Sequence, residues 1–135
     1  MREIIGVDFS TEIQVRFADL DAYGHVNHAT FFTFLETART LVFKEPFLEL
    51  MGRRLLLMIV QAECRYLKPV DLNGQVIVTM QLEKSRRTSF TLGYLVHDGQ
   101  GTTFAEASTV MVCFDEKRGK PVAIADEMKR ALGLI

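Results

Sequence analysis

The period of the hydrophobic pattern changes along the chain, and each period predicts a different element. From residue 11 to residue 17 apolar and polar positions alternate, which predicts a half-buried strand. Residues 18–27 are rich in Asp, Gly, His and Asn and predict a loop. After Gly52 the alternation returns and continues to about residue 115. Most of the predicted sheet therefore follows a segment that is not a strand.

That segment predicts one long helix, from about His28 to Glu45, which Pro46 ends or kinks. Apolar side chains occupy most of its circumference. The polar remainder is a narrow stripe: Thr33, Glu36, Thr37, Thr40 and Lys44. A helix that packs on one flat surface needs an apolar face narrower than this one. We therefore expect a curved sheet or a partner subunit to surround this helix.

The strands expected after Gly52 are 54–60, 60–68, 75–84, 88–97 and 102–115. Short turns join the later ones, which is typical of an antiparallel meander. Asp126 is expected to cap a short terminal helix that runs to Leu132. The fold class is therefore α+β, with an antiparallel sheet of five to six strands wrapped around one long central helix. We expect a single domain over residues 1–135.

The alternation also assigns the two faces of the sheet. Residues 76, 78, 80 and 82 are apolar and share a face, as do residues 90, 92, 94 and 96. On the other face we expect Ile77, Leu95 and Met111. One chain has no second layer to cover that face, so their burial favours an oligomer.

Composition excludes several classes of protein. Hydrophobic residues make up 48% and charged residues 24%, the formal net charge is −1, and no basic block stands out. We therefore expect no nucleic-acid or membrane-surface partner. No apolar run reaches the roughly 20 residues of a membrane span, so we expect no membrane insertion. The first residues have no apolar core typical of a signal peptide, and we expect a cytoplasmic protein. Cys64 and Cys113 lie in apolar runs, and no ligand cluster predicts a metal site.

Four segments resemble a known family. Residues 15–29 (VRFADLDAYGHVNHA) contain an Asp-x-Asp-x-x-Gly loop directly before the helix, and residues 31–39 (FFTFLETAR) form the helix itself. Residues 65–70 (RYLKPV) and 86–90 (RRTSF) follow in the same order. Together they resemble the 4-hydroxybenzoyl-CoA thioesterase-like branch of the hotdog-fold superfamily.

The resemblance implies hydrolysis of an acyl-CoA or acyl-carrier-protein thioester. It also implies a homodimer or homotetramer with active sites at the dimer interface. Such chemistry needs no cofactor, because coenzyme A is part of the substrate. A thiol with a pKa of about 8.5 leaves readily, so one carboxylate and one oxyanion site can suffice.

By the resemblance, Asp21 is the catalytic carboxylate, either as a general base on water or as a nucleophile that forms a mixed anhydride. Loop aspartates more often shape turns, and we expect that role for Asp19. The position that matches the family's oxyanion donor is the backbone N–H of His28, at the positive end of the helix dipole. The side chain of His28 either lines the site or packs at the sheet edge.

Other residues of this loop are candidates for substrate binding. Gly24 either lets substrate approach the backbone or permits a tight turn. His25 is given at most a supporting role. Asn27 is expected to be the helix N-cap rather than a substrate contact.

The candidates for binding the CoA phosphates lie between two later strands: Arg86, Arg87, Thr88 and Ser89. The alternative interpretation is that these four residues belong to a solvated hairpin and bind no ligand. The acyl pocket is expected to come from Phe31, Phe32, Leu57, Met58 and Ile59, which are equally compatible with a place in the core.

Three alternatives stay open. Glu36, in the middle of the helix, ranks second to Asp21 as the catalytic acid. A hotdog dehydratase or hydratase would pair a His with a carboxylate, and a non-catalytic acyl-thioester binding module would keep only the pocket. His28 also stands where many relatives have a second Asn, which leaves the acyl group unsettled.

Overall fold

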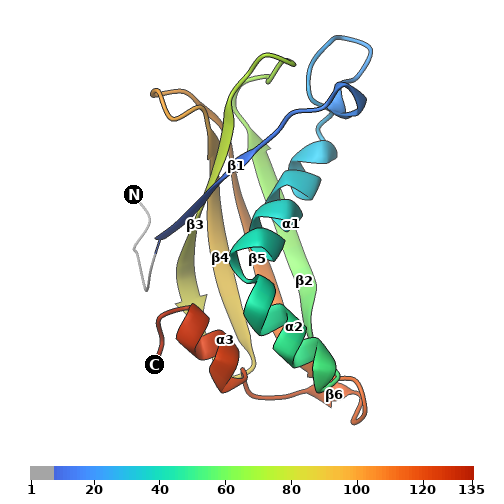
Figure 1. Cartoon of the computed structure of the whole chain (residues 1–135), viewed down its shortest axis with the longest axis vertical. Coiled ribbons are helices and arrows are strands. Elements are labelled where there is room, and N and C mark those ends of the chain that lie inside the picture. The colour runs from blue at the N-terminus through green and yellow to red at the C-terminus, as the bar shows by residue number, and fades with distance from the viewer. Residues whose placement is uncertain (1–7) are drawn as a thin grey trace.

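The computed structural model describes residues 8–135, in which a curled antiparallel sheet packs its inner face against the helices (Figure 1). The strands are β1 (Asp8–Ile13), β2 (Leu55–Tyr66), β3 (Val76–Ser85), β4 (Ser89–His97), β5 (Thr103–Asp115) and β6 (Lys120–Pro121). The helices are α1 (Thr30–Val42), α2 (Lys44–Gly52) and α3 (Asp126–Ala131). The strand order is β1-β3-β4-β5-β2, and β6 pairs with β5. The predicted architecture, a sheet of five to six strands curled around a central helix, is confirmed.

The inner face of the sheet is the one that the alternation predicted. The apolar residues at positions 76, 78, 80 and 82 of β3 are fully buried, and so are those at 90, 92, 94 and 96 of β4. Leu35 and Ala38 of α1 are also fully buried in the same core. Burial of this continuous apolar surface is what holds α1 in the concave side of the sheet.

The long helix predicted over residues 28–45 is two consecutive helices. Phe43 is the C-cap of α1 and the N-cap of α2, and its buried side chain anchors the junction. Pro46 lies in the first turn of α2. A proline is tolerated there because the first N–H groups of a helix have no partner within the helix. Pro46 therefore stands at the beginning of a helix, where the sequence suggested an end or a kink.

The prediction of two strands over 54–60 and 60–68 is wrong, because β2 is one strand of 12 residues. Its pairing with β5 skips Val60, where the register shifts between Ile59 and Gln61. Residues 55–60 are all apolar, so they contain no alternation from which strand continuity could be read.

Three further details differ from expectation. The strand predicted over 11–17 ends at Ile13, and Phe17 is 80% exposed because the chain turns into a short 3-10 helix, Phe17–Asp19. Met111 was expected on the outer face but faces the core, where it pairs with Phe90. Both faces of β5 are apolar near this position, so the pattern could not choose between them. Asp126 is the first residue of α3, and the N-cap is Ala125.

The sheet leaves apolar side chains uncovered in this chain. Leu95 is exposed and Ile77 is half-buried on the outer face, as expected. At the free edge of β2 the exposed residues include Met58, Ile59 and Val60. Among the described residues, no helix is both long enough and apolar enough to cross a bilayer. The expectation that no signal peptide is present concerns residues outside the described range.

Candidate active site

The loop between β1 and α1 is a small closed turn. Leu20 and Val26 form an antiparallel bridge, and Asp21 N–H donates to the His25 carbonyl at 2.8 Å. The N–H of Gly24 donates to the Asp21 carbonyl at 3.1 Å. The φ of Gly24, +80°, lies in the region that favours glycine. Gly24 thus has the turn role that was one of its two expected roles.

Asp19 is a structural residue, as expected. Its carboxylate is 3% exposed and accepts two hydrogen bonds of 2.8 Å, from the backbone N–H and the guanidinium of Arg16. Burial by itself would raise the pKa of Asp19, but the hydrogen bonds and charge of Arg16 outweigh it and hold the pKa below its ordinary value. The backbone carbonyl of Asp19 accepts the N–H of Asn27 at 2.8 Å, which ties the start of the helix to this loop.

Asp21 carries a half-exposed carboxylate on the same loop. Its Oδ1 accepts the backbone N–H of Tyr23 at 2.9 Å and that of His25 at 3.3 Å. Within residues 8–135 its Oδ2 receives no hydrogen bond. One oxygen therefore shapes the turn while the other stays available to a ligand. The contact with His25 goes through the backbone and not through the imidazole ring.

The start of the helix follows directly. Asn27 Oδ1 accepts the N–H of Ala29 at 2.9 Å, so Asn27 caps the turn that leads into α1 although the formal N-cap is Ala29. The N–H of His28 has no acceptor in the part of the chain that the structure describes. Its imidazole is exposed and meets the ring of Tyr66 edge-on at 6.2 Å. The segment thus carries a free backbone donor and an available carboxylate oxygen, which are the two kinds of group that an acyl-transfer site requires.

Sequence reasoning missed Tyr66 as a site residue, although residues 65–70 belong to the segments that carry the family resemblance. Its hydroxyl donates to the His28 carbonyl at 2.7 Å, and its ring packs edge-on against Phe31 at 5.1 Å. Burial of the hydroxyl, with the neighbouring Cys64 thiol, raises the pKa of Tyr66 to about 12. Tyr66 therefore remains a neutral donor at physiological pH and holds the first turn before α1.

The turn that contains Arg86 lies far from this loop within one chain. Ser89 pairs with Val112, and Val112 also pairs with Met58 of β2. Tyr66, which contacts His28, lies roughly 25 Å further along β2. Arg86 and Arg87 are exposed, and Arg86 N–H donates to the Ser89 carbonyl at 2.8 Å in the hairpin turn. Thr88 bonds through its backbone carbonyl to Cys113 N–H at 2.9 Å. A single chain does not bring these residues to Asp21.

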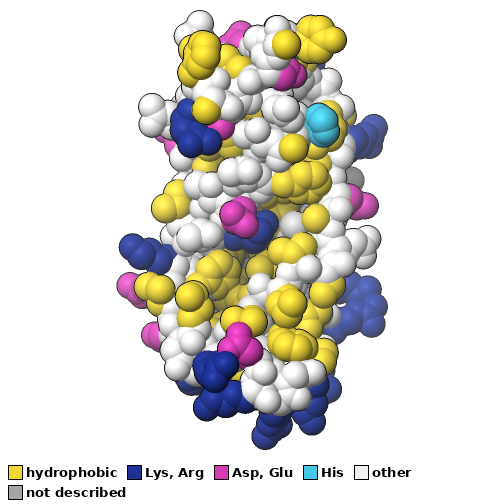
Figure 2. All heavy atoms as spheres, turned by 90° about the vertical axis from the view of Figure 1, so that its right-hand side faces the viewer, with side chains coloured by type: hydrophobic (Ala, Val, Ile, Leu, Met, Phe, Trp, Pro, Cys, Tyr) yellow, Lys and Arg dark blue, Asp and Glu magenta, His cyan; other side chains and the backbone are white. Residues whose placement is uncertain are grey.

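A cavity of about 440 Å³ lies between α1, α2 and β2. Its walls are mainly apolar and include three of the five residues predicted for the acyl pocket: Leu57, Met58 and Ile59. Figure 2 shows this hollow lined by hydrophobic side chains, with acidic and basic groups together at its upper rim. Phe31 does not line the cavity and is buried in the core, and Phe32 is partly exposed elsewhere on α1.

Two charged residues of α1 also line the cavity. Glu36, the second candidate for the catalytic acid, is exposed at its wall. Arg39 is only 7% exposed, and nothing in the hydrophobic pattern indicated a buried charge there. Within residues 8–135, no group of three or more His, Cys, Asp or Glu side chains is placed to hold a metal ion.

Comparison with known proteins identifies the family. A model of the thioesterase-like superfamily matches residues 15–132. The chain is 30% identical over 125 residues to the long-chain acyl-CoA thioesterase FadM of Escherichia coli K12, covering 90% of this chain and 95% of FadM. YbaW, a probable thioesterase from Escherichia coli, superimposes with a TM-score of 0.83 at 29% identity, covering 93% of this chain and 97% of YbaW.

A thioesterase from Thermus thermophilus, solved in complex with coenzyme A and zinc, has a TM-score of 0.78 at 28% identity. This match covers 91% of the present chain and 90% of the Thermus chain. The matches confirm the hotdog fold and the thioester hydrolysis predicted from the sequence: the chain belongs to the thioesterase-like superfamily.

Proposed function

We propose that this thioesterase hydrolyses acyl-CoA at a site shared by two subunits, with Asp21 as its catalytic carboxylate. The observation that carries the proposal is the pairing of two free groups on one loop. Oδ2 of Asp21 and the backbone N–H of His28 have no hydrogen-bond partner among the described residues, whereas Oδ1 of Asp21 and the N–H groups of Ala29 and Thr30 are bonded. The relatives named as acyl-CoA thioesterases support the choice of substrate.

The reaction needs only these groups and water. The N–H of His28 donates to the thioester oxygen as negative charge develops on it. Asp21 either takes the proton from an attacking water or attacks the carbonyl carbon itself and is released by water afterwards. In both routes the C–S bond breaks and the thiolate leaves, because a thiol with a pKa of about 8.5 needs no strong acid to assist it. No cofactor takes part.

The edge of β2 supports the dimer. A long edge strand with exposed apolar side chains is normally covered, because its unpaired N–H and C=O groups invite another strand. An antiparallel pair of β2 strands from two copies would set the Tyr66 end of one copy beside the Leu55 end of the other. In such a dimer, Asp21 of one copy would lie closer to Arg86 of the partner subunit than to the Arg86 of its own chain. The CoA phosphates would bind at that arginine.

Thiol release from a panel of short-chain, long-chain and aromatic acyl-CoAs tests this function. Asp21→Asn keeps the size of the side chain and one oxygen for the turn, and should lower kcat by at least about 100-fold. Asp98→Asn is the matched control, because Asp98 Oδ1 also accepts backbone N–H groups two and four residues ahead. It should hydrolyse at the wild-type rate.

Hydrolysis that survives in Asp21→Asn would exclude the proposed role and transfer it to Glu36 or His28. If wild type releases no thiol from any CoA ester, acyl-CoA is not the substrate, and acyl carrier protein becomes the substrate to test.

A further inference from the structure

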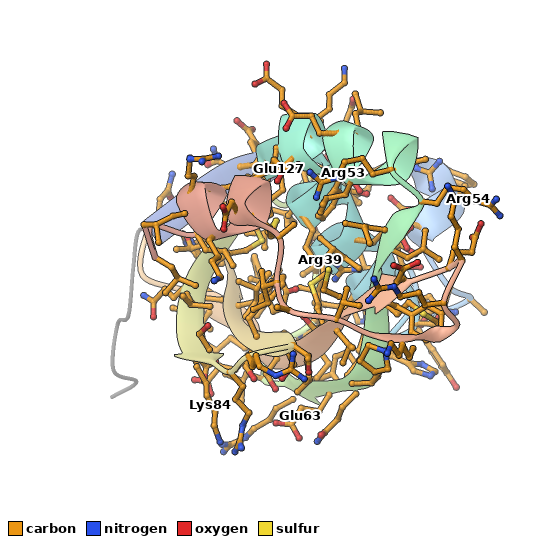
Figure 3. The ribbon with its side chains drawn as sticks, turned by 90° about the horizontal axis from the view of Figure 1, so that it is seen from below. Arg39, Arg53, Arg54, Glu63, Lys84 and Glu127 are labelled. Atoms are coloured by element: carbon orange, nitrogen blue, oxygen red, sulfur yellow. The ribbon has the colours of Figure 1, made fainter. Side chains whose placement is uncertain are left out.

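Among the described residues, Arg39 is a buried cation without a carboxylate partner. Its Nη1 donates to the Tyr94 hydroxyl at 3.3 Å, and that hydroxyl bonds to Thr109 Oγ1 at 2.6 Å. No Asp or Glu lies within 4.0 Å of its guanidinium among residues 8–135, not even Glu36 one turn earlier on the same helix. Figure 3 shows Arg39 in the interior, between the helices and the sheet, whereas Lys84 and Glu63 project from the outer side of the sheet.

The remaining donors of Arg39 face the cavity. A guanidinium has five N–H donors, and one long bond to a neutral phenol satisfies only one of them. No fully buried side-chain nitrogen or oxygen among the described residues lacks a partner. The unbonded nitrogens of Arg39 are therefore not sealed in the core but reach the surface of the 440 Å³ cavity that the residue lines.

Apart from Thr40 and Glu36, which forms no ion pair with Arg39, the rest of the cavity wall is apolar. It includes Phe47, Leu50, Leu55 and Leu57, and a volume of 440 Å³ falls within the range of ligand pockets. A cation on an apolar wall is costly unless it finds an acceptor. Within residues 8–135, the acceptor it has is the single phenol oxygen of Tyr94.

The position of Arg39 on α1 limits where an acceptor would lie in the substrate. From Thr30 to Arg39 the helix rises about 14 Å. The thioester carbonyl is proposed to bind at the start of this helix. A group that reaches Arg39 is therefore distant from the thioester and lies toward the far end of a medium or long acyl chain.

From this geometry we propose that Arg39 makes the enzyme select acyl thioesters whose chain carries a distal oxygen, as a hydroxyl or a carboxylate. This inference rests on the proposed function, since it assigns the cavity to the acyl chain. The methylene groups pack against the apolar wall, and the distal oxygen accepts the free N–H groups of Arg39. An unsubstituted chain of the same length leaves those donors without a partner, or traps water beside them.

The experiment compares kcat/KM for dodecanoyl-CoA, ω-hydroxydodecanoyl-CoA and the ω-carboxy analogue. Wild type should prefer both oxygenated chains by about tenfold or more, as expected for a hydrogen bond to a charged donor. Arg39→Met keeps an unbranched apolar stem and removes the guanidinium, and should reverse this order. Tyr94→Phe, which retains Arg39, should keep the wild-type preference.

Equal kcat/KM for the three substrates in wild type would overturn the inference while leaving the proposed function intact. An unchanged preference in Arg39→Met would also overturn it. If Arg39→Met does not fold, Arg39→Lys keeps a cation and should still favour the ω-carboxy chain, and loss of that preference counts against the proposal. If wild type hydrolyses none of the CoA esters, the proposed function fails, and the inference fails with it.

Discussion

The hydroxyl of Tyr66, on the edge strand β2, donates a 2.7 Å hydrogen bond to the backbone carbonyl of His28, in the turn that begins α1. This bond joins two segments that are far apart in the sequence. It fixes the turn that presents the free N–H of His28, so it connects the sheet with the proposed oxyanion site.

Tyr66→Phe should therefore lower kcat by about tenfold and change KM little, because Tyr66 positions the His28 N–H, which we propose acts mainly in the transition state. Steady-state kinetics with the best acyl-CoA measure this split. Tyr23→Phe is the control, since Tyr23 is 86% exposed and belongs to the same loop region. An equal loss in both variants would mean that the effect is not specific to the His28 turn.

Asp19→Asn should lower the free energy of unfolding by about 1–3 kcal/mol at neutral pH, because it weakens the charge-assisted bonds from Arg16 to a buried carboxylate. The folded state lowers the pKa of Asp19, so its ionised form stabilises the fold above the pKa of the unfolded chain, about 4. That contribution disappears as pH falls through the lower folded-state pKa. Urea unfolding of wild type and variant at several pH values should show the two stabilities converging in acid. A constant difference down to about pH 2 would contradict the assignment.

Val60→Lys should weaken the proposed dimer. Val60 is 60% exposed on the free edge of β2, at the position where pairing with β5 is skipped, so its side chain supports little of the chain's own sheet. A lysine on an edge strand discourages strand addition. Sedimentation velocity should show a shift toward monomer, with a parallel loss of activity. Leu48→Lys, on the exposed face of α2, makes the same change away from the edge and should remain like wild type.

Tyr94→Phe should cost about 1–3 kcal/mol, because it leaves the buried Thr109 hydroxyl and one donor of Arg39 without their partner. The double variant Tyr94→Phe with Thr109→Val removes both ends of the shorter bond and should recover part of that loss. Denaturant melts of the three variants give the coupling energy. Strict additivity would mean that the 2.6 Å bond adds nothing to stability.

Much of the fold could be predicted because buried residues recur at a regular spacing along each strand. The buried apolar residues of β3 and β4 recur at every second position, and the loop before α1 contains Asp19, Asp21 and Gly24 at fixed offsets. Where both faces of a strand are apolar, as at Val60 and Met111, the pattern carries no information about pairing or face. At these two positions the predicted strand division and the predicted face are wrong.

The candidate site was predictable only in part. Asp21 and His28 could be proposed because the Asp-x-Asp-x-x-Gly loop that carries the family resemblance and the start of the helix are contiguous in the sequence. The contact of Tyr66 with His28 depends on the tertiary fold, and the burial of Arg39 depends on the packing of α2 and β2 around it. The separation of Arg86 from Asp21 depends on which strands pair with one another, and the strand order β1-β3-β4-β5-β2 does not follow the order in the chain.

The distance between Asp21 and Arg86 within one chain has a consequence for enzyme assays. If a complete site needs the loop of one copy and the arginines of another, the number of working sites follows mass action. Activity per milligram would then decline as the enzyme is diluted below the dissociation constant of the dimer. It would recover on concentration, without any change in the covalent structure of the protein.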